Sequence, residues 1–224
     1  MPITSCVGCR LFMGNKPVLI TIASLAIAGS IAWIVYQMPG RRPSVELDPY
    51  RALGEVAAQE TGRLLNRNGQ VVIVSREMPA GANPVEEAKL KAFVAALKSA
   101  GVGVESNERF SLPPSARLFG SNIPRDWFLK LLQTHNKAAF VLFAEFPALE
   151  PADTEKLKKE GVKIIVISGS QSGAKRLVDD GLVQFAVVPR GESPPAAATS
   201  RQTTRETFDR YYAILAPGKT TGSP

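Results

Sequence analysis

Residues 163–190 read KIIVISGSQSGAKRLVDDGLVQFAVVPR, a stretch that predicts a strand, a helix and a second strand in succession. Lys163–Ser168 and Leu182–Val188 are short runs rich in β-branched residues, which are typical of strands buried on both faces. Between them, Ser172–Asp180 has the spacing of an amphipathic helix. Two strands joined by a crossover helix predict a right-handed βαβ unit in a parallel sheet.

The same alternation extends towards the N-terminus, interrupted by a long predicted loop at Ser106–Asn122. We therefore predict an α/β fold: a doubly wound parallel sheet of five strands, Rossmann-like or flavodoxin-like, with strand order 2-1-3-4-5. The other predicted strands are Val71–Ser75, Val102–Glu105 and Ala138–Phe143, and the other predicted helices are Asp48–Asn66, Pro84–Ala100, Pro124–His135 and Ala152–Glu160.

The predicted domain occupies residues 48–190 and follows a hinge at residues 39–47. A tail at residues 1–16 and an apolar segment at residues 17–38 precede the hinge. After the domain, composition divides the chain into three further segments. These are a linker rich in Ser, Pro, Ala and Thr at 191–206, an apolar-aromatic segment at 207–216 that forms either a last helix or an edge strand, and a disordered tail at 217–224.

The apolar segment predicts a transmembrane helix. Residues 17–38 contain no charged residue, and 22 helical residues span about 33 Å, enough for a hydrocarbon core of about 30 Å. Trp33 and Tyr36 lie near its end, where aromatic rings prefer the headgroup level. A cleaved signal peptide with an A-x-A site at Ala26–Ala28 is the alternative. We expect a single-pass anchor in a bacterial inner membrane, with the domain outside the cytoplasm (periplasmic).

The net charge of +7 does not indicate a nucleic-acid-binding surface. Four basic residues, Arg10, Lys16, Arg41 and Arg42, flank the apolar segment, and the first acid in the chain is Glu46. The rest of the chain therefore carries only +3, without a basic stripe interleaved with aromatics. The excess charge fits contacts with anionic headgroups beside a membrane helix.

Candidate ligand-binding residues lie in the loops that follow the predicted strands. In open α/β sheets, ligands bind beyond the carboxyl ends of the strands, near the point where strand order reverses. Arginine forks there bind carboxylates, phosphates or sugar hydroxyls, and carboxylate and hydroxyl oxygens accept hydrogen bonds. The residues that this rule selects are Ser75, Arg76, Glu145, Ser168, Ser170 and Arg190.

The glycine-containing stretch GSQSGAK at Gly169–Lys175 follows a strand and opens a helix, where backbone N–H groups favour an anion. It is not a Walker A loop, because three residues separate its glycines. Nor is it a nucleophile elbow, because Gln171 occupies the central position. The alternative to weak anion binding is a tight turn capped by Ser172.

Few residues are available for metal or triad chemistry. His135 is the only histidine, and it lies at a predicted helix end, where a cation suits the helix dipole. Cys6 and Cys9, the only cysteines, precede the apolar segment. This pair is either two incidental thiols, a redox pair, or half of a zinc site completed by a second chain. We predict no metal and no cofactor for the domain.

Five stretches within residues 70–190 carry a resemblance to a known family: VVIVS at 71–75, AKLKAFVAALKSAGVGVE at 88–105, AAFVLFAEFPAL at 138–149, KIIVISGS at 163–170 and AKRLVDDGLVQFAVVPR at 174–190. Taken together, they resemble one lobe of the type 1 periplasmic sugar-binding proteins and their repressor relatives. That family closes two lobes on a ligand, whereas this chain has length for one.

The favoured function is a membrane-anchored, non-catalytic binding module. It would sense a small sugar-like or anionic ligand, or dock a partner protein, and its single lobe would complete a cleft by forming a homodimer or by pairing with that partner. The alternatives are a structural component of a membrane assembly, or a hydrolase or transferase on the same scaffold. Fold alone does not decide among them.

Overall fold

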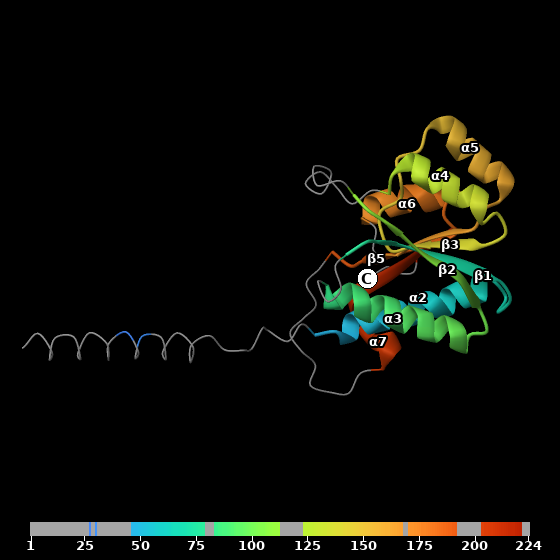
Figure 1. The fold of residues 1–224 in the computed structure, drawn as a ribbon. Helices are drawn as coiled ribbons and strands as arrows, with labels where there is room; N and C mark the ends of the chain where they lie inside the picture. Colours follow the sequence, from blue (N-terminus) through green and yellow to red (C-terminus); the bar gives the residue numbers. More distant parts are fainter. Residues whose placement is uncertain are drawn as a thin grey trace, which may run out of the picture. The chain divides into compact units, whose positions relative to one another are not determined.

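The structure is a computed structural model that describes Ile27, Ser30 and residues 46–78, 83–112, 123–167, 170–191 and 203–220 (Figure 1). The chain divides into two units, Met1–Val45 and Glu46–Pro224, and every element named below belongs to the second. Within the described ranges no helix has the length and apolar character needed to cross a bilayer. The predicted transmembrane segment, apart from Ile27 and Ser30, lies outside these ranges, as do Cys6 and Cys9.

The described residues form one sheet of seven strands in the order β2-β1-β3-β4-β5-β6-β7. Strands β1 to β5 are parallel, which confirms the doubly wound α/β fold and the order 2-1-3-4-5. Strand β6 pairs antiparallel with β5, and β7 pairs antiparallel with β6. The strands are β1 (Gln70–Arg76), β2 (Gly103–Phe110), β3 (Ala139–Leu142), β4 (Ile164–Ile167), β5 (Phe185–Pro189), β6 (Tyr212–Ala216) and β7 (Lys219–Thr220).

Helices cover both faces of the sheet (Figure 1). One face carries α2, α3 and α7, and the other carries α4, α5 and α6. This division follows from right-handed crossovers that run in opposite directions along the sheet: α3 connects β1 to β2, whereas α4, α5 and α6 connect β2 to β3, β3 to β4 and β4 to β5. The helices are α2 (Asp48–Leu64), α3 (Pro84–Ser99), α4 (Arg125–Thr134), α5 (Pro151–Glu160), α6 (Gln171–Asp179) and α7 (Thr204–Tyr211).

The central strands separate two apolar cores. In β1, Val71 and Ile73 face the core beneath α2, α3 and α7, and Val72 and Val74 face the core beneath α4, α5 and α6. Strands β3 and β4 are buried along their whole length. Continuous runs of β-branched and aromatic residues form these strands because both faces of the sheet are covered.

Helices α2 and α3 approach each other closely at Gly54. A Cβ atom added there would lie 2.2 Å from the Lys89 carbonyl oxygen and 2.9 Å from the Phe93 amide nitrogen. Helix α3 begins at Pro84, and the Asn83 side chain caps it by accepting hydrogen bonds from two backbone N–H groups of its first turn. The glycine brings the first turns of α3 close against α2, which determines where Lys89 lies.

The predicted sheet of five strands is corrected to seven. Residues of the predicted linker and apolar-aromatic segment form α7 and β6, so the sheet continues past residue 190. Gly218 has a φ of +68° in the turn between β6 and β7, within the predicted tail. Strand β2 continues to Phe110, into the stretch predicted as a loop. Both errors concern strands near the sheet edges, where exposed polar side chains mask the apolar pattern.

Candidate functional site

The strand order reverses between β1 and β3. Chain segments leave the carboxyl ends of these neighbours on opposite faces of the sheet, which is the usual position of a ligand crevice in doubly wound folds. Backbone hydrogen bonds connect the residues just after these strands to the neighbouring strand: Phe143 N donates to Val74 O at 2.8 Å, and Glu77 N donates to Phe110 O at 2.9 Å. Residues directly after β1 and β3 are therefore held next to each other.

Three of the predicted residues lie at this edge. Ser75 and Arg76 end β1 and are both partly buried. Because side chains alternate along a strand, Ser75 lies on the α2/α3 side with Val71 and Ile73, whereas Arg76 lies on the opposite side. Glu145, after β3, is exposed. Ser75 and Arg76 therefore do not line the same face.

The other three predicted residues do not join them. Ser168 lies outside the described residues, and Ser170 is the exposed N-cap residue of α6. The side chain of Arg190 turns towards β6, where its Nε donates to Tyr212 O at 3.0 Å. Two strands separate β5 from β1, a distance of about 14 Å at the usual strand spacing. The structure therefore ties Arg190 to the added strand rather than to the β1/β3 edge.

A lysine that the sequence analysis did not select lies at the β1/β3 edge. Lys89, in the second turn of α3, is 3% exposed, and it is the charged residue buried in the described part of the chain. Its Nζ lies 2.8 Å from Oε1 of Glu86, whose side chain is 40% exposed. The same ammonium stands 5.5 Å from the ring centroid of Phe143, the residue that follows β3. An acid and an aromatic ring thus compensate a buried cation.

Three tyrosines extend this cluster. Burial raises the pKa of the Tyr212 phenol, and the neighbouring Tyr50, Tyr211 and Glu86 raise it further. Tyr50 lies in the first turn of α2, Tyr211 ends α7 and Tyr212 begins β6. We call Lys89, Glu86, Phe143, Tyr50, Tyr211 and Tyr212 the Lys89 cluster.

The Lys89 cluster has the composition of a recognition site for a polar small molecule. Ligand sites combine aromatic walls with a few placed polar groups. Here Glu86 is partly exposed, Tyr50 and Tyr211 are half-buried, and Lys89 holds the Glu86 carboxylate. These groups can form hydrogen bonds to a polar molecule. The carboxylate and the phenols can bond to hydroxyl groups, and the ammonium can donate to an oxygen acceptor.

A sequence signal for Lys89 does exist. Lys89, Phe93 and Leu97 recur every four residues and are the buried residues of α3. A lysine in line with the apolar stripe of a helix indicates a buried cation rather than a solvated one. The tyrosines could not be found in this way, because Tyr212 is far from Tyr50 and Glu86 in the sequence and comes near them only through the fold.

His135 forms a separate, structural contact. As predicted, it lies at the end of α4, where it is the C-cap residue. Its Nδ1 lies 2.7 Å from Oε1 of Glu105, and its Nε2 lies 3.9 Å from Oε1 of Glu108. The two carboxylates face different ring nitrogens, so one metal ion could not bind both pairs. No metal-binding group of three or more His, Cys, Asp or Glu occurs among the described residues. His135 joins α4 to the edge strand β2.

No protein-family model matches the chain, and no curated protein matches it. Among solved structures, AraP, an arabinose-binding protein from Geobacillus stearothermophilus, is 15% identical with a TM-score of 0.47, over 62% of this chain and 45% of that one. An ABC transporter solute-binding protein from Burkholderia graminis, in complex with D-arabinose, is 12% identical with a TM-score of 0.48, over 77% and 61%. A LacI-type transcriptional regulator from Bacteroides fragilis is 11% identical with a TM-score of 0.44, over 75% and 50%.

These structures are sugar-binding proteins and a repressor relative, the classes that the sequence resemblance named. This chain covers from 45% to 61% of their lengths. At such low identities the likeness concerns the fold alone. The function must therefore be argued from the residues of this chain.

Proposed function

We propose that the domain is a non-catalytic module that binds a small ligand, sugar-like or anionic, at the carboxyl ends of β1 and β3. The observation that carries the proposal is Lys89, a buried ammonium with one carboxylate partner at the strand-order reversal. Burying a lysine costs several kcal/mol, and an apolar side chain of similar size often gives equal or higher stability. Packing alone therefore does not account for the charge, whereas recognition of a polar ligand does.

In this proposal the Lys89 cluster makes most of the contacts. The exposed part of Glu86 accepts hydrogen bonds from ligand hydroxyls, and Tyr50 and Tyr211 supply aromatic surface. Ser75 lies on the same side of the sheet and adds a hydroxyl, and Glu145 approaches from the loop after β3. A second copy of the chain or a partner protein closes the cleft from the open side. Light scattering with and without ligand tests for that closure.

A ligand screen tests the proposal. The full-length chain, purified in detergent, is heated with sugars, small carboxylates and phosphates, and unfolding is followed by circular dichroism. A ligand at 100 times its Kd stabilises the folded state by about 2.7 kcal/mol. We expect Lys89→Met to abolish this shift and Lys91→Met, an exposed change on the same helix, to keep it. Equal shifts in both variants would place the ligand elsewhere, and no shift with any compound would contradict a small-ligand function.

We also propose that residues 17–38 anchor the chain in the membrane and that the domain faces the periplasm. The support is the length of the uncharged segment, 22 residues, set against a bilayer core of about 30 Å. Retention of the chain in membranes after alkaline carbonate washing tests the anchor. Digestion of the domain by protease added to spheroplasts tests the side. A chain released by carbonate refutes the anchor, and a protected domain refutes the orientation.

A further inference from the structure

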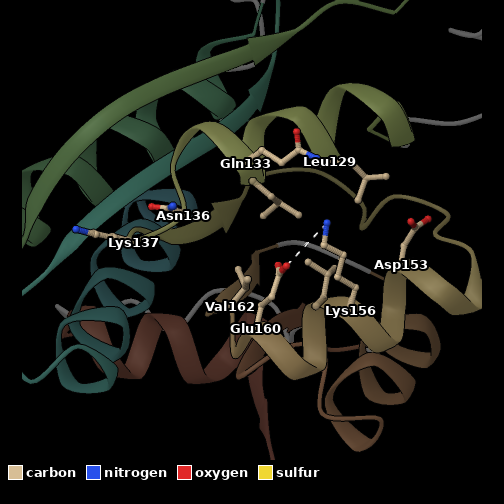
Figure 2. A pocket seen from close by; sticks show the side chains of 10 residues that line it. Leu129, Gln133, Asn136, Lys137, Asp153, Lys156, Glu160 and Val162 are labelled. Carbon is tan, nitrogen blue, oxygen red and sulfur yellow. Dashed lines mark ion pairs between the residues drawn. The ribbon is translucent and has the colours of Figure 1, made fainter.

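A cavity of about 700 Å³ lies between α4 and α5, on the face of the sheet opposite the Lys89 cluster (Figure 2). The charges of its lining balance, because they come from two lysines and two acids, and the rest of its wall combines apolar side chains with two amides. Neither charge nor polarity therefore selects a class of ligand for this cavity. The Lys89 cluster, in contrast, contains a contact whose role the proposed function does not include.

Two tyrosines of the Lys89 cluster lie where helix α7 passes directly into strand β6. Tyr211 ends the helix and Tyr212 begins the strand, with no loop between them. Tyr212 N donates to Phe208 O, as in a helix, while the φ and ψ of Tyr212, −133° and 159°, are those of a strand. The last carbonyl groups of a helix have no partner within it, so this junction needs hydrogen-bond donors from elsewhere in the fold.

Arg190 supplies two such donors. Its backbone N donates to Tyr211 O at 2.8 Å, and its side-chain Nε donates to Tyr212 O at 3.0 Å. Strand β7 pairs with β6 at Leu215 and Ala216, away from this junction. Arg190 therefore fixes two consecutive peptide groups, and with them the directions in which the two tyrosine side chains leave the backbone.

The side chains fixed in this way form one aromatic unit. The ring centroids of Tyr211 and Tyr212 are 6.4 Å apart, and those of Tyr212 and Phe208 are 5.7 Å apart. Tyr212 is 8% exposed and belongs to the core beneath α2, α3 and α7, whereas Tyr211 is half-buried and packs against that core. A shift of the backbone at the junction would move both rings away from Tyr50 and Glu86, which lie close enough to act on the Tyr212 phenol.

We propose that Arg190 is a positioning residue of the ligand site, which acts on the ligand through Tyr211 and Tyr212. This role rests on the proposed function, because it requires that the ligand binds at the Lys89 cluster. The Arg190 side chain is directed towards β6 and not towards the β1/β3 edge. It therefore orders the aromatic wall of the site without touching the ligand.

Nitration of tyrosines by tetranitromethane at pH 8 tests the positioning in the absence of ligand. The reagent attacks the phenolate, and burial raises the pKa of Tyr212, so Tyr212 should react slowly in the full-length chain. Arg190→Met keeps the backbone N–H and removes the Nε donor. If the loosened phenol becomes exposed and its pKa falls by one unit, the phenolate fraction rises about tenfold. We therefore expect nitration of Tyr212, mapped by mass spectrometry, to be about tenfold faster.

Two further variants are the controls. Arg176→Met removes an arginine of α6 whose side chain is 86% exposed, and it should leave the nitration rate unchanged. Arg190→Lys keeps a donor and should restore slow nitration of Tyr212. The proposal is overturned if Arg190→Met and Arg176→Met are nitrated equally, or if Arg190→Lys reacts as fast as Arg190→Met. Circular dichroism checks the folding of each variant, and Arg190→Gln, with the same expected direction, takes the place of an unfolded Arg190→Met.

The thermal screen with sugars, small carboxylates and phosphates is then repeated on the variants. For a compound that shifts the unchanged chain, Arg190→Met should raise the Kd about tenfold, because binding must then order two tyrosine side chains; Arg176→Met should not change it. An unchanged Kd in Arg190→Met would overturn the positioning role. Weaker binding without faster nitration would indicate direct contact between Arg190 and the compound, and would also overturn it. If no compound shifts the unchanged chain, the proposed function fails, and the nitration rates still decide whether Arg190 holds the tyrosines.

Discussion

Replacing Gly54 with alanine should destabilise the domain, although alanine is the better helix former. The added Cβ would lie 2.2 Å from the Lys89 carbonyl oxygen and 2.9 Å from the Phe93 amide nitrogen. Both are backbone atoms, so no side-chain rotation relieves the clash, and α2 and α3 must separate by about 1 Å. A gap of that size forfeits about a quarter to a half of the dispersion energy at each contact.

The expected magnitude follows from two opposing effects. Overpacking a core costs about 1–3 kcal/mol, and a backbone obstruction places this case at the upper end. The higher helix propensity of alanine offsets about 1 kcal/mol of this destabilisation. The net loss is therefore about 2 kcal/mol, or about 4–8 °C in Tm for a domain of this size. Urea denaturation followed by circular dichroism measures it.

Gly173→Ala in α6 is the matched control. Its added Cβ meets only the Ser170 hydroxyl, at 2.9 Å, and that hydroxyl can rotate away. This variant should gain up to about 1 kcal/mol from helix propensity. If Gly54→Ala were as stable as the unchanged chain, or changed in the same direction as Gly173→Ala, the close approach of α2 and α3 would be refuted.

Three further predictions concern ion pairs and helix α7. Lys89→Met should leave the stability of the domain unchanged or slightly raised. Glu86→Gln should cost about 1–3 kcal/mol, because it leaves a buried ammonium without a counter-charge. If urea titrations gave the reverse ranking of the two variants, the buried ion pair would be refuted. The pKa of Asp153 is lowered, chiefly by its hydrogen bond from Arg125, so its contribution to stability is present above the unfolded-state pKa and is lost as pH falls through the folded value. Asp153→Asn should therefore destabilise the domain at pH 7 and make little difference at pH 2, and a constant difference between those pH values would contradict this. Phe208→Ala should cost about 3–5 kcal/mol, since Phe208 is 1% exposed in the core beneath α2 and α3; a cost below about 1 kcal/mol would mean that α7 does not belong to the domain.

The central sheet could be predicted from the sequence because its strands are apolar on both faces. The runs VVIV in β1 and IIVI in β4 predict strands that are buried on both faces. A single helix between successive strands predicts that these strands are connected by parallel crossovers. The edges could not be predicted in this way. Strand β2 is largely exposed and polar, with Glu105 and Glu108 facing His135, and β6 depends on antiparallel pairing with β5. The sequence left residues 207–216 open between a last helix and an edge strand, and the structure contains both, since helix α7 ends at Tyr211 and strand β6 begins at Tyr212.

The site proposed here lies at the edge of the sheet that the strand-end rule selects, but mostly with other residues. The strand-end rule selects loop residues, and of these Ser75 lies on the side of the Lys89 cluster. Arg190 donates a hydrogen bond to the Tyr212 carbonyl oxygen in β6, a contact that the sequence does not predict. The strand-end rule does not select Lys89, because this residue lies within helix α3 and not in a loop after a strand. A charged residue within an apolar stripe is the feature to look for in such helices.

The most direct test of a ligand site at the Lys89 cluster is hydrogen exchange of the full-length chain, with and without a ligand found by the thermal screen. The account predicts slower exchange in the first turns of α3 and in the residues that follow β3, with no change in α6. Protection confined to α6, or to α4 and α5, would contradict the proposal that ligand binds at the carboxyl ends of β1 and β3.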